Sequence, residues 1–340
     1  MPSESEIISR IRQRARANDQ VLVGIGDDAA VLKRGGATDL IACCDLMVEG
    51  THFRREWTRA GLLGRKALAV TLSDVAAMGG VPKFAMVSLA LPRSLPSDFI
   101  EELIEGIFKL ADSSGVSIIG GDTSSSVDSL FIDTSVIGEC ATGRAVTRRG
   151  AEVGDLLYVT GALGASALGL SLLEQGLRLE DDWQSKPPAG LKDSAAQEAL
   201  LKHLAPEPRL KLGQAIGERG LASAMIDISD GLSTDLSRIL DESNCGAIIE
   251  ADAIPIAGCL RSFAMNDSEI DPLRLALHGG EEYELLFSSS PENRGGIAEL
   301  SNELGEPITA IGRVAGGRGL QLERGGALEL LQPSGYEHEV

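Results

Sequence analysis

Residues 67–80 read ALAVTLSDVAAMGG, an apolar segment whose single charged residue is Asp74. Apolar residues recur at helical spacing over residues 62–78, which predicts a helix. Asp74 shares one face of that helix with three apolar residues. Burying an ionised carboxylate without a partner costs several kcal/mol. Asp74 therefore needs a cation, which is either a metal ion or the side chain of Arg65 or Lys66.

Further aspartates lie inside or at the ends of apolar runs, mostly beside glycine: Asp27, Asp28, Asp45, Asp122, Asp227 and Asp230. Basic partners are scarce, because the chain has 31 Lys and Arg against 50 Asp and Glu and few of them flank these runs. Divalent metal ions are then the expected counter-charge. Hard oxygen ligands without His or Cys indicate Mg²⁺. Asp45 lies within a predicted strand, where a metal ion is favoured over a pair with Arg.

The composition is typical of a globular α/β protein, with 43% hydrophobic residues and 40 glycines. A chain of 340 residues suits two domains, each with its own core. Arginines cluster at residues 144–149, just before a predicted strand over residues 156–160. The boundary is expected there, which gives an N-terminal domain of residues 1–146 and a C-terminal domain of residues 147–340.

The formal net charge of -19 argues against a nucleic-acid partner, because phosphate backbones require a basic face. A phosphate-bearing substrate would also be repelled unless metal ions intervene. The five cysteines form no CxxC pair, and an odd number fits no simple disulfide framework. No signal peptide and no membrane-spanning run is recognisable. We therefore expect a cytoplasmic protein with reduced thiols and no membrane association.

Periodicity and turn residues predict an alternation of strands and helices in both halves. Strands are expected at residues 20–25, 29–32, 40–48, 84–91, 116–119, 130–140, 156–160, 224–228, 247–250, 282–287 and 308–314. Helices are expected at residues 62–78, 98–112, 164–175, 195–203 and 233–241, with Ser97 as an N-cap. Each half contains a strand that ends in an acidic glycine turn, which indicates two α/β domains of related plan.

Nucleotide-binding fingerprints of the common kinds are absent, since no GxxxxGK[ST] occurs and no GxGxxG joins a strand to a helix. Residues 120–126, GGDTSSS, offer backbone N–H groups, hydroxyls and a carboxylate directly after a strand. This suits a phosphate and its metal, although a plain serine-rich loop would look the same. In residues 226–231, IDISDG, alternation along a strand end places Asp227 and Ser229 on the same side.

Three further positions carry both a functional and a structural interpretation. Glu281, in the segment HGGEEYE of residues 278–284, either faces a cationic ligand or only caps the sheet. His52 is one of four histidines, and a lone histidine is more often structural than catalytic. Arg148 belongs either to a solvated linker or to a clamp for phosphates, which arginine binds in a bidentate manner.

Seven segments, taken in this order, resemble the thiamine-monophosphate kinases: GIGDDAAVL (24–32), CDLMVEGTHF (44–53), ALAVTLSDVAAMGG (67–80), IIGGDTS (118–124), GRAVTRRGA (143–151), MIDISDGLSTDL (225–236) and HGGEEYELLF (278–287). The resemblance runs from about residue 20 to the C-terminus. That family belongs to the superfamily of aminoimidazole ribonucleotide synthetase and selenophosphate synthetase. The resemblance implies two α/β domains of this type and a homodimer joined through the N-terminal sheets.

The resemblance also implies a role for individual residues. Several Mg²⁺ ions would be bound by Asp28, Asp45, Asp74, Asp122, Asp227 and Asp230. ATP would contact Gly121, Asp122, Arg148 and Ser229. Thiamine monophosphate would contact His52, Glu281 and Tyr336, whereas Asp27 would only shape its turn.

The activity implied is the transfer of the γ-phosphoryl group of ATP directly and in line to thiamine monophosphate, which gives thiamine diphosphate in the last step of its biosynthesis. No residue is expected to act as a general base, because a phosphate monoester with a second pKa near 6 is already deprotonated. Positioning and electrostatic stabilisation would carry the catalysis.

Cys43 and Cys44 depart from the family, whose members usually carry a Ser-Thr pair before the metal-binding aspartate. Because thiols are poor ligands for hard cations, these positions either contribute backbone carbonyls or leave one metal ion more loosely held. Two other functions remain open. One is the aminoimidazole ribonucleotide synthetase reaction, and the other is a catalytically idle dimer that senses ATP and metal.

Overall fold

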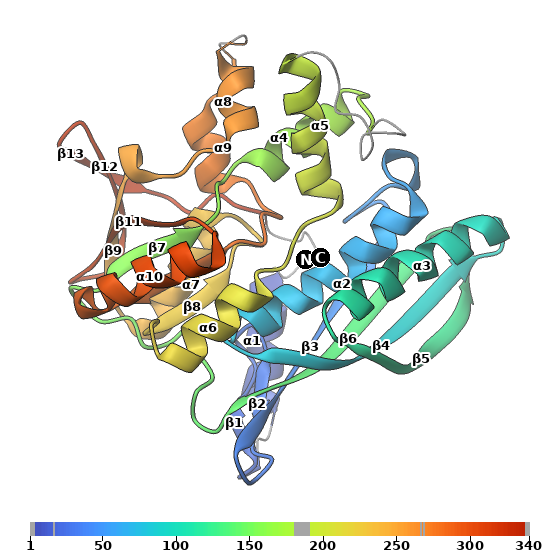
Figure 1. The fold of residues 1–340 in the computed structure, drawn as a ribbon, viewed down its shortest axis with the longest axis horizontal. Coiled ribbons are helices and arrows are strands. Elements are labelled where there is room, and N and C mark those ends of the chain that lie inside the picture. Colours follow the sequence, from blue (N-terminus) through green and yellow to red (C-terminus); the bar gives the residue numbers. More distant parts are fainter. Residues whose placement is uncertain (1–3, 16–17, 180–190, 266, 268, 337–340) are drawn as a thin grey trace.

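The computed structural model describes residues 4–15, 18–179, 191–265, 267 and 269–336. Its strands form two separate sheets, one of six strands in the first half of the chain and one of seven in the second (Figure 1). The predicted two-domain α/β architecture is therefore confirmed. The proposed boundary at residues 146 and 147 lies between the last strand of the first sheet and the first strand of the second.

The N-terminal sheet has the strand order β1-β2-β3-β6-β4-β5. Only β4 and β5 run parallel, whereas every other neighbouring pair is antiparallel. The strands are β1 (Val21–Val23), β2 (Ala30–Leu32), β3 (Thr38–Val48), β4 (Val81–Pro92), β5 (Ser117–Ser126) and β6 (Phe131–Ala141). β5 is thus an edge strand, and it contains the segment that we expected to be a phosphate-binding loop.

Two helices, α2 (Ala60–Ala77) and α3 (Ser97–Ser113), cover one face of this sheet (Figure 1). Leu68, Leu72 and Val75 of α2 are fully buried in the core between helix and sheet. The helices cross in close contact, because a Cβ atom on Gly64 would lie 2.0 Å from the carbonyl oxygen of Leu103. Glycine at this position therefore sets how closely α3 approaches α2.

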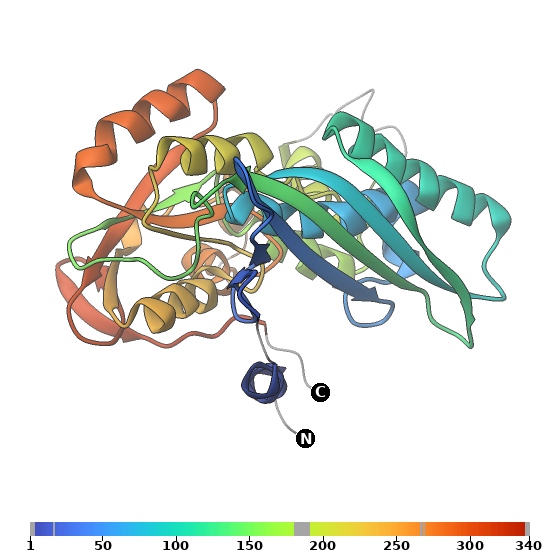
Figure 2. The same ribbon diagram turned by 90° about the horizontal axis from the view of Figure 1, so that it is seen from below.

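The described helices leave the opposite face of the N-terminal sheet uncovered (Figure 2). Large apolar side chains are exposed on it, namely Leu46 (53%), Phe84 (44%), Met86 (38%) and Ile119 (55%). An exposed apolar patch of this kind marks an interaction surface in a soluble protein.

The C-terminal sheet has the order β13-β12-β9-β11-β7-β10-β8. Its strands are β7 (Leu156–Thr160), β8 (Ala224–Asp227), β9 (Gly246–Glu250), β10 (Leu285–Ser289), β11 (Ile308–Ala315), β12 (Gly319–Arg324) and β13 (Ala327–Leu331). The accompanying helices are α4 (Ala165–Glu174), α5 (Leu191–Leu204), α6 (Leu210–Arg219), α7 (Leu232–Ser243), α8 (Gly258–Ala264), α9 (Pro272–His278) and α10 (Arg294–Leu304). A further helix, α1 (Glu4–Arg14), stands apart from both sheets (Figure 2).

The end of α2 packs against the C-terminal half, so this helix joins the two domains. Ala76 and Ala77 belong to a buried cluster with Leu212 of α6 and Phe287 of β10. A Cβ atom on Gly213 would lie 2.1 Å from the carbonyl oxygen of Ala76, which shows how closely α6 approaches α2. Asp74, one turn earlier, consequently lies at the junction of the two sheets.

Several details differ from the sequence-based prediction. Residues 120–126 form part of β5 and not a loop, because the strand continues its parallel pairing with β4 as far as Ser126. Ser97 is the first residue of α3 and Pro96 is its N-cap. Residues 282–284 precede β10. The helices α1, α6, α8, α9 and α10 and the strands β12 and β13 were not predicted.

Within the part of the chain that the structure describes, none of the helices combines the length and the apolar content needed to span a bilayer.

Candidate active site

Three aspartates that are far apart in the sequence come together where the two domains meet. Asp28 follows the turn before β2, Asp74 lies near the end of α2, and Asp227 is the last residue of β8. One carboxylate oxygen from each lies within 4.8 Å of the other two. Asp28 is 9% exposed and Asp227 is 2% exposed. These three residues are called the acidic cluster below.

Asp45 borders the acidic cluster from strand β3. It alternates in register with the buried residues Ile41 and Met47, so its side chain points to the face of the sheet that α2 covers. The pKa of the Asp45 carboxyl is raised, first by burial and also by nearby charges that include Asp28. Four of the six aspartates that we expected to bind metal are thus close to one another.

Burial and mutual repulsion both disfavour the ionised forms of the cluster. Burial raises the pKa of Asp74 well above its usual range, and the charges of Asp45, Asp227 and Asp28 raise it further. Asp227 shows the same direction for the same reasons, with burial first and Asp28 second. A bound cation would replace the protons that these carboxyl groups otherwise retain.

The donor atoms fit a hard divalent cation. Oδ2 of Asp28 and Oδ2 of Asp45 are buried and accept no hydrogen bond from any described residue. Leaving a buried carboxylate oxygen without a hydrogen-bond or metal partner costs free energy of folding. Every candidate ligand is a carboxylate oxygen, which is the chemistry that Mg²⁺ prefers.

Arg148 is bound to the cluster and does not stand free in a linker. Its Nη2 donates to Oδ1 of Asp28 at 2.5 Å, and the side chain of Asp28 is 1% exposed. Burial opposes the charge of this guanidinium, but the carboxylates of Asp28, Asp27 and Asp227 together outweigh that effect, and the pKa of Arg148 is raised. The backbone N–H of Arg148 donates to both carboxylate oxygens of Asp27 at 3.2 Å. Asp27 therefore ties the turn to the segment that carries Arg148.

Asp230 does not join the acidic cluster. Its carboxylate forms an ion pair with Arg238 of α7, whose Nη1 also lies 2.7 Å from Oδ1 of Asp235. The carbonyl oxygen of Asp230 accepts a 3.0 Å hydrogen bond from the backbone of Tyr336. The C-terminal tail is thus attached beside Asp230, and the expected metal ligand is neutralised by a guanidinium group.

Asp122 lies on the other side of the N-terminal sheet. In the strand register Asp122 is opposite Ser88, which is opposite Asp133, which is in turn opposite Leu46. Because directly opposite residues point the same way, Asp122 faces the uncovered side with Leu46, whereas Asp45 faces α2. The sheet itself therefore separates Asp122 from the acidic cluster within one chain.

Gly121 has a structural reason to be glycine. Its φ is +151°, and a Cβ atom would lie 1.7 Å from the carbonyl oxygen of Val87 on the neighbouring strand. β5 can pair with β4 here only without a side chain at this position. The glycine is thus explained without a phosphate.

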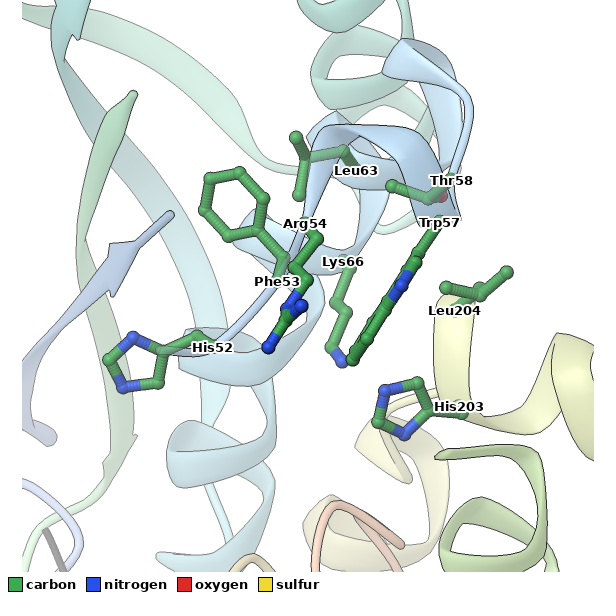
Figure 3. Close-up of a pocket in the computed structure, with 9 residues that line it drawn as sticks. All are labelled: His52, Phe53, Arg54, Trp57, Thr58, Leu63, Lys66, His203 and Leu204. Atoms are coloured by element: carbon green, nitrogen blue, oxygen red, sulfur yellow. The ribbon is translucent and has the colours of Figure 1, made fainter. Parts of the chain in front are cut away.

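A small pocket lies between residues 52–58, helix α2 and the end of α5 (Figure 3). Its lining consists of His52, Phe53, Arg54, Trp57, Thr58, Leu63, Lys66, His203 and Leu204. Glu281 lies next to it, with Oε1 2.8 Å from Nζ of Lys66. The backbone N–H of Val48 donates to Nδ1 of His52 at 2.9 Å, so the Nε2 atom of neutral His52 carries the proton.

The three glutamates of residues 281–284 point to three different places. Glu282 accepts hydrogen bonds from the backbone of Gly164 and Ser166 at the start of α4, at 2.8 and 3.1 Å. Glu284 is 1% exposed and accepts hydrogen bonds from Lys202, Arg209 and Thr160. Only Glu281 is directed towards the pocket.

Sequence reasoning missed three residues of this region. Lys66 and His203 line the pocket and contact Glu281, and Ser73 donates to Oδ2 of Asp227 at 2.6 Å. A signal existed for two of them, because Lys66 and Ser73 are polar residues within the apolar stretch around Asp74. We considered Lys66 only as a partner for Asp74. His203 lay in a segment that carried no recognisable motif.

Comparisons with known proteins agree with this geometry. The family model described as AIR synthase related protein, N-terminal domain, matches residues 26–140, and that of the C-terminal domain matches residues 152–325. The chain is similar to the thiamine-monophosphate kinase of Rhodopirellula baltica, with 36% identity over 343 residues that cover 98% of this chain and 97% of the relative. It is 37% identical to that of Bacillus subtilis, over 92% of this chain and 91% of the relative.

A solved structure described as AaThiL complexed with AMPPCP and TMP is also similar. It matches with a TM-score of 0.84 and 29% identity, over 99% of this chain and 97% of that chain. The similarity extends over both sheets and the junction between them.

Proposed function

This chain belongs to the thiamine-monophosphate kinase family, built from the two AIR synthase related domains, and we propose that its acidic cluster is where phosphoryl transfer takes place. The protein phosphorylates thiamine monophosphate to thiamine diphosphate with ATP as the donor. The main support for this location is that three carboxylates, those of Asp28, Asp74 and Asp227, converge at the junction of the domains.

Both substrates of this reaction are negatively charged, so the site has to overcome their mutual repulsion. ATP brings about four negative charges, and a phosphate monoester brings up to two because its second pKa is near 6. Two unit charges about 4 Å apart repel by about 4 kcal/mol at an effective dielectric constant near 20. The acceptor oxygen is already deprotonated, so the site needs counter-charge and alignment and no general base. Direct in-line transfer follows from these requirements.

Asp28, Asp45, Asp74 and Asp227 would hold Mg²⁺, which when bound supplies counter-charge between the two polyanions. Arg148 adds a fixed positive charge beside Asp28 and orients that carboxylate. Its Nε is buried and makes no hydrogen bond to any described residue. Ser229, two residues beyond Asp227, would contact ATP on the same side of the junction.

The organic part of thiamine monophosphate would lie towards the pocket beside Glu281 and His52. Burial opposes the charge of the Glu281 carboxylate, but nearby positive charges lower the pKa of Glu281. Lys66 has the largest of these effects, and His52 also contributes. A carboxylate here suits the cationic thiazolium ring. Tyr336 is attached at Asp230 and 49% exposed, which supports a contact with the substrate from the C-terminal tail.

We place the roles of Gly121 and Asp122 in a homodimer. Both lie on β5, and Asp122 shares the uncovered face of the sheet with the exposed residues Leu46 and Phe84. A second copy packed on this face would bury the apolar patch and place Asp122 in the interface between the two copies. Light scattering tests the association: Phe84→Asp is expected to give a monomer, whereas Phe108→Asp, on the exposed side of α3, leaves the dimer intact. A wild-type protein that remains monomeric at micromolar concentration contradicts the pairing.

One assay tests the function. The protein is incubated with ATP and Mg²⁺, with and without thiamine monophosphate, and both ADP and thiamine diphosphate are measured. The proposal predicts that the two products appear in equal amounts and only when thiamine monophosphate and Mg²⁺ are present. The absence of both products would exclude the proposal and favour an idle nucleotide-binding dimer, whereas ADP formed without thiamine diphosphate would indicate an ATPase.

The state of the cysteines bears on the cell compartment in which the protein works. All five cysteines are free, and Cys140, Cys245 and Cys259 are buried without pairing. Free buried thiols suit a reducing compartment, which supports a cytoplasmic location.

A further inference from the structure

Lys66 is an uncommon feature of helix α2. It is 2% exposed in a helix whose neighbouring residues Leu63 and Ala67 are each 1% exposed. A buried ammonium group is costly unless it is paired. Its Nζ lies 2.8 Å from Oε1 of Glu281, and this ion pair crosses from the N-terminal domain to the loop before β10.

The second carboxylate oxygen of Glu281 also has a buried neighbour. Nδ1 of His203 on α5 lies 3.2 Å from Oε2 of Glu281 and 3.1 Å from Oγ of Ser166. His203 is 3% exposed. Burial, followed by the charge of Lys66, lowers the pKa of this imidazole to about 4, so it is neutral near pH 7. Both oxygens of Glu281 are therefore oriented by buried groups from two other helices.

The backbone of Glu281 is held in a conformation that a glutamate rarely adopts. Its φ is +59°, in the left-handed region. Its N–H donates to the carbonyl oxygen of Ser229 at 2.7 Å, and Tyr283, with φ +51°, donates to that of Ile228 at 2.9 Å. A non-glycine residue in this region persists where the surrounding contacts determine it. The loop thus presents Glu281 in one defined orientation.

We infer that Lys66 and His203 are positioning residues, which hold the Glu281 carboxylate at the edge of the pocket so that it receives the cationic ring end of thiamine monophosphate. Both residues line that pocket themselves, together with His52 and Trp57 (Figure 3). A carboxylate has about four lone-pair sites, so each oxygen retains one for the substrate after these contacts. This inference rests on the proposed function and adds to it the means by which substrate affinity is set.

At metal sites, losing the group that orients a ligating side chain typically costs about 10–100-fold in affinity, and an effect of similar size is expected for the loss of a group that orients Glu281. Lys66→Met is therefore expected to raise the KM for thiamine monophosphate by about tenfold or more, while the KM for ATP changes by less than about twofold. His203→Gln is expected to raise the KM for thiamine monophosphate as well. The matched control is Arg65→Met, the adjacent residue of α2, which pairs with Glu207 outside the pocket. Thermal unfolding of each variant verifies that it is folded.

A double-mutant cycle with Glu281→Gln separates positioning from general damage. If Lys66 acts through Glu281, adding Lys66→Met to the Glu281→Gln variant changes the KM for thiamine monophosphate by less than about twofold. If the two effects multiply, Lys66 acts independently and the inference is wrong. It is also wrong if Lys66→Met behaves like Arg65→Met, or if it raises the KM for ATP equally. In those cases the wild-type assay still supports the proposed function, whereas an inactive wild-type protein overturns both.

Discussion

The hydroxyl group of Ser73 donates a 2.6 Å hydrogen bond to Oδ2 of Asp227, across 154 positions of the chain. Ser73 is on α2 and Asp227 ends β8, so the bond joins the two domains next to Asp74. Both partners are buried, with exposed fractions of 0% and 2%. The approach of the second domain to the first is thus coupled to the geometry of the acidic cluster.

Ser73→Ala tests this coupling. The change leaves Asp227 without its hydroxyl donor and is expected to lower the free energy of unfolding by about 1–2 kcal/mol. The Mg²⁺ concentration for half-maximal activity is expected to rise several-fold, because Asp227 is no longer held in place. Urea unfolding and a Mg²⁺ titration of activity measure the two effects. Ser113→Ala, which removes a hydroxyl bonded within α3, serves as control; an equal Mg²⁺ requirement in both variants would count against the coupling.

Asp74→Asn tests the role of the cluster in catalysis. Activity is expected to fall by at least about a hundredfold, because one carboxylate facing the substrates is lost. In metal-free buffer the Tm is expected to rise, since the substitution removes a carboxyl group whose pKa is raised by burial and by the charges of Asp45 and Asp227, and which the wild-type chain must therefore protonate in order to fold. Mg²⁺ should then stabilise the wild-type protein more than the variant. Normal turnover in Asp74→Asn would show that the assignment is wrong; Glu101→Gln, on exposed α3, controls for charge alone.

Gly121 and Gly120 form a matched pair on β5. Gly121→Ala is expected to lower the free energy of unfolding by at least about 2 kcal/mol, because its Cβ would lie 1.7 Å from the carbonyl oxygen of Val87. Gly120→Ala has nothing within 4 Å and is expected to cost less than about 1 kcal/mol. Urea unfolding of both variants compares them directly. Equal stabilities would mean that β5 does not approach β4 as described.

His203 and Glu282 are expected to give opposite pH dependences of stability. Burial lowers the pKa of His203 from 6.5 to about 4, so between these values the unfolded chain holds a proton that the folded chain lacks. Stability then rises with pH. Burial raises the pKa of Glu282 from 4.5 to about 7, so in that range the folded chain holds the extra proton and stability falls with pH. Each contribution amounts to about 3 kcal/mol at most.

Single variants reveal contributions that oppose each other in the wild-type protein. Relative to wild type, His203→Gln is expected to lose less stability on acidification from pH 7 to pH 4. Glu282→Gln is expected to be more stable than wild type at pH 8 and close to it at pH 4.5. Guanidinium chloride unfolding at several pH values measures both differences. Parallel curves for the two variants would contradict the opposite signs.

The buried acids could be recognised from the sequence because their setting is local. Asp28, Asp45, Asp74 and Asp227 each interrupt an apolar run, and the cost of burying a lone carboxylate predicts that they share a cation. The structure brings these four together. Asp230 has the same local pattern, but its carboxylate forms an ion pair with Arg238 of α7.

The direction in which a side chain points, and the segment with which it pairs, could not be predicted from the local sequence. Residues 120–126 have the Gly and Ser content of a loop, and only pairing with β4 makes them a strand. Whether Asp122 points towards the acidic cluster or away from it depends on the register of β5. Lys66 reads as a partner for the nearby Asp74, whereas its actual partner, Glu281, is supplied by the second domain. These outcomes are set by tertiary contacts between distant segments.

Divalent cations are expected to bind between the carboxylates of the acidic cluster. Anomalous diffraction from crystals grown with Mn²⁺, a non-hydrolysable ATP analogue and thiamine monophosphate tests it most directly, because manganese scatters anomalously and takes the same oxygen ligands. We predict anomalous peaks within bonding distance of the carboxylate oxygens of Asp28, Asp74 and Asp227. A fully occupied complex with both substrates in place and no peak at these three residues would contradict the account.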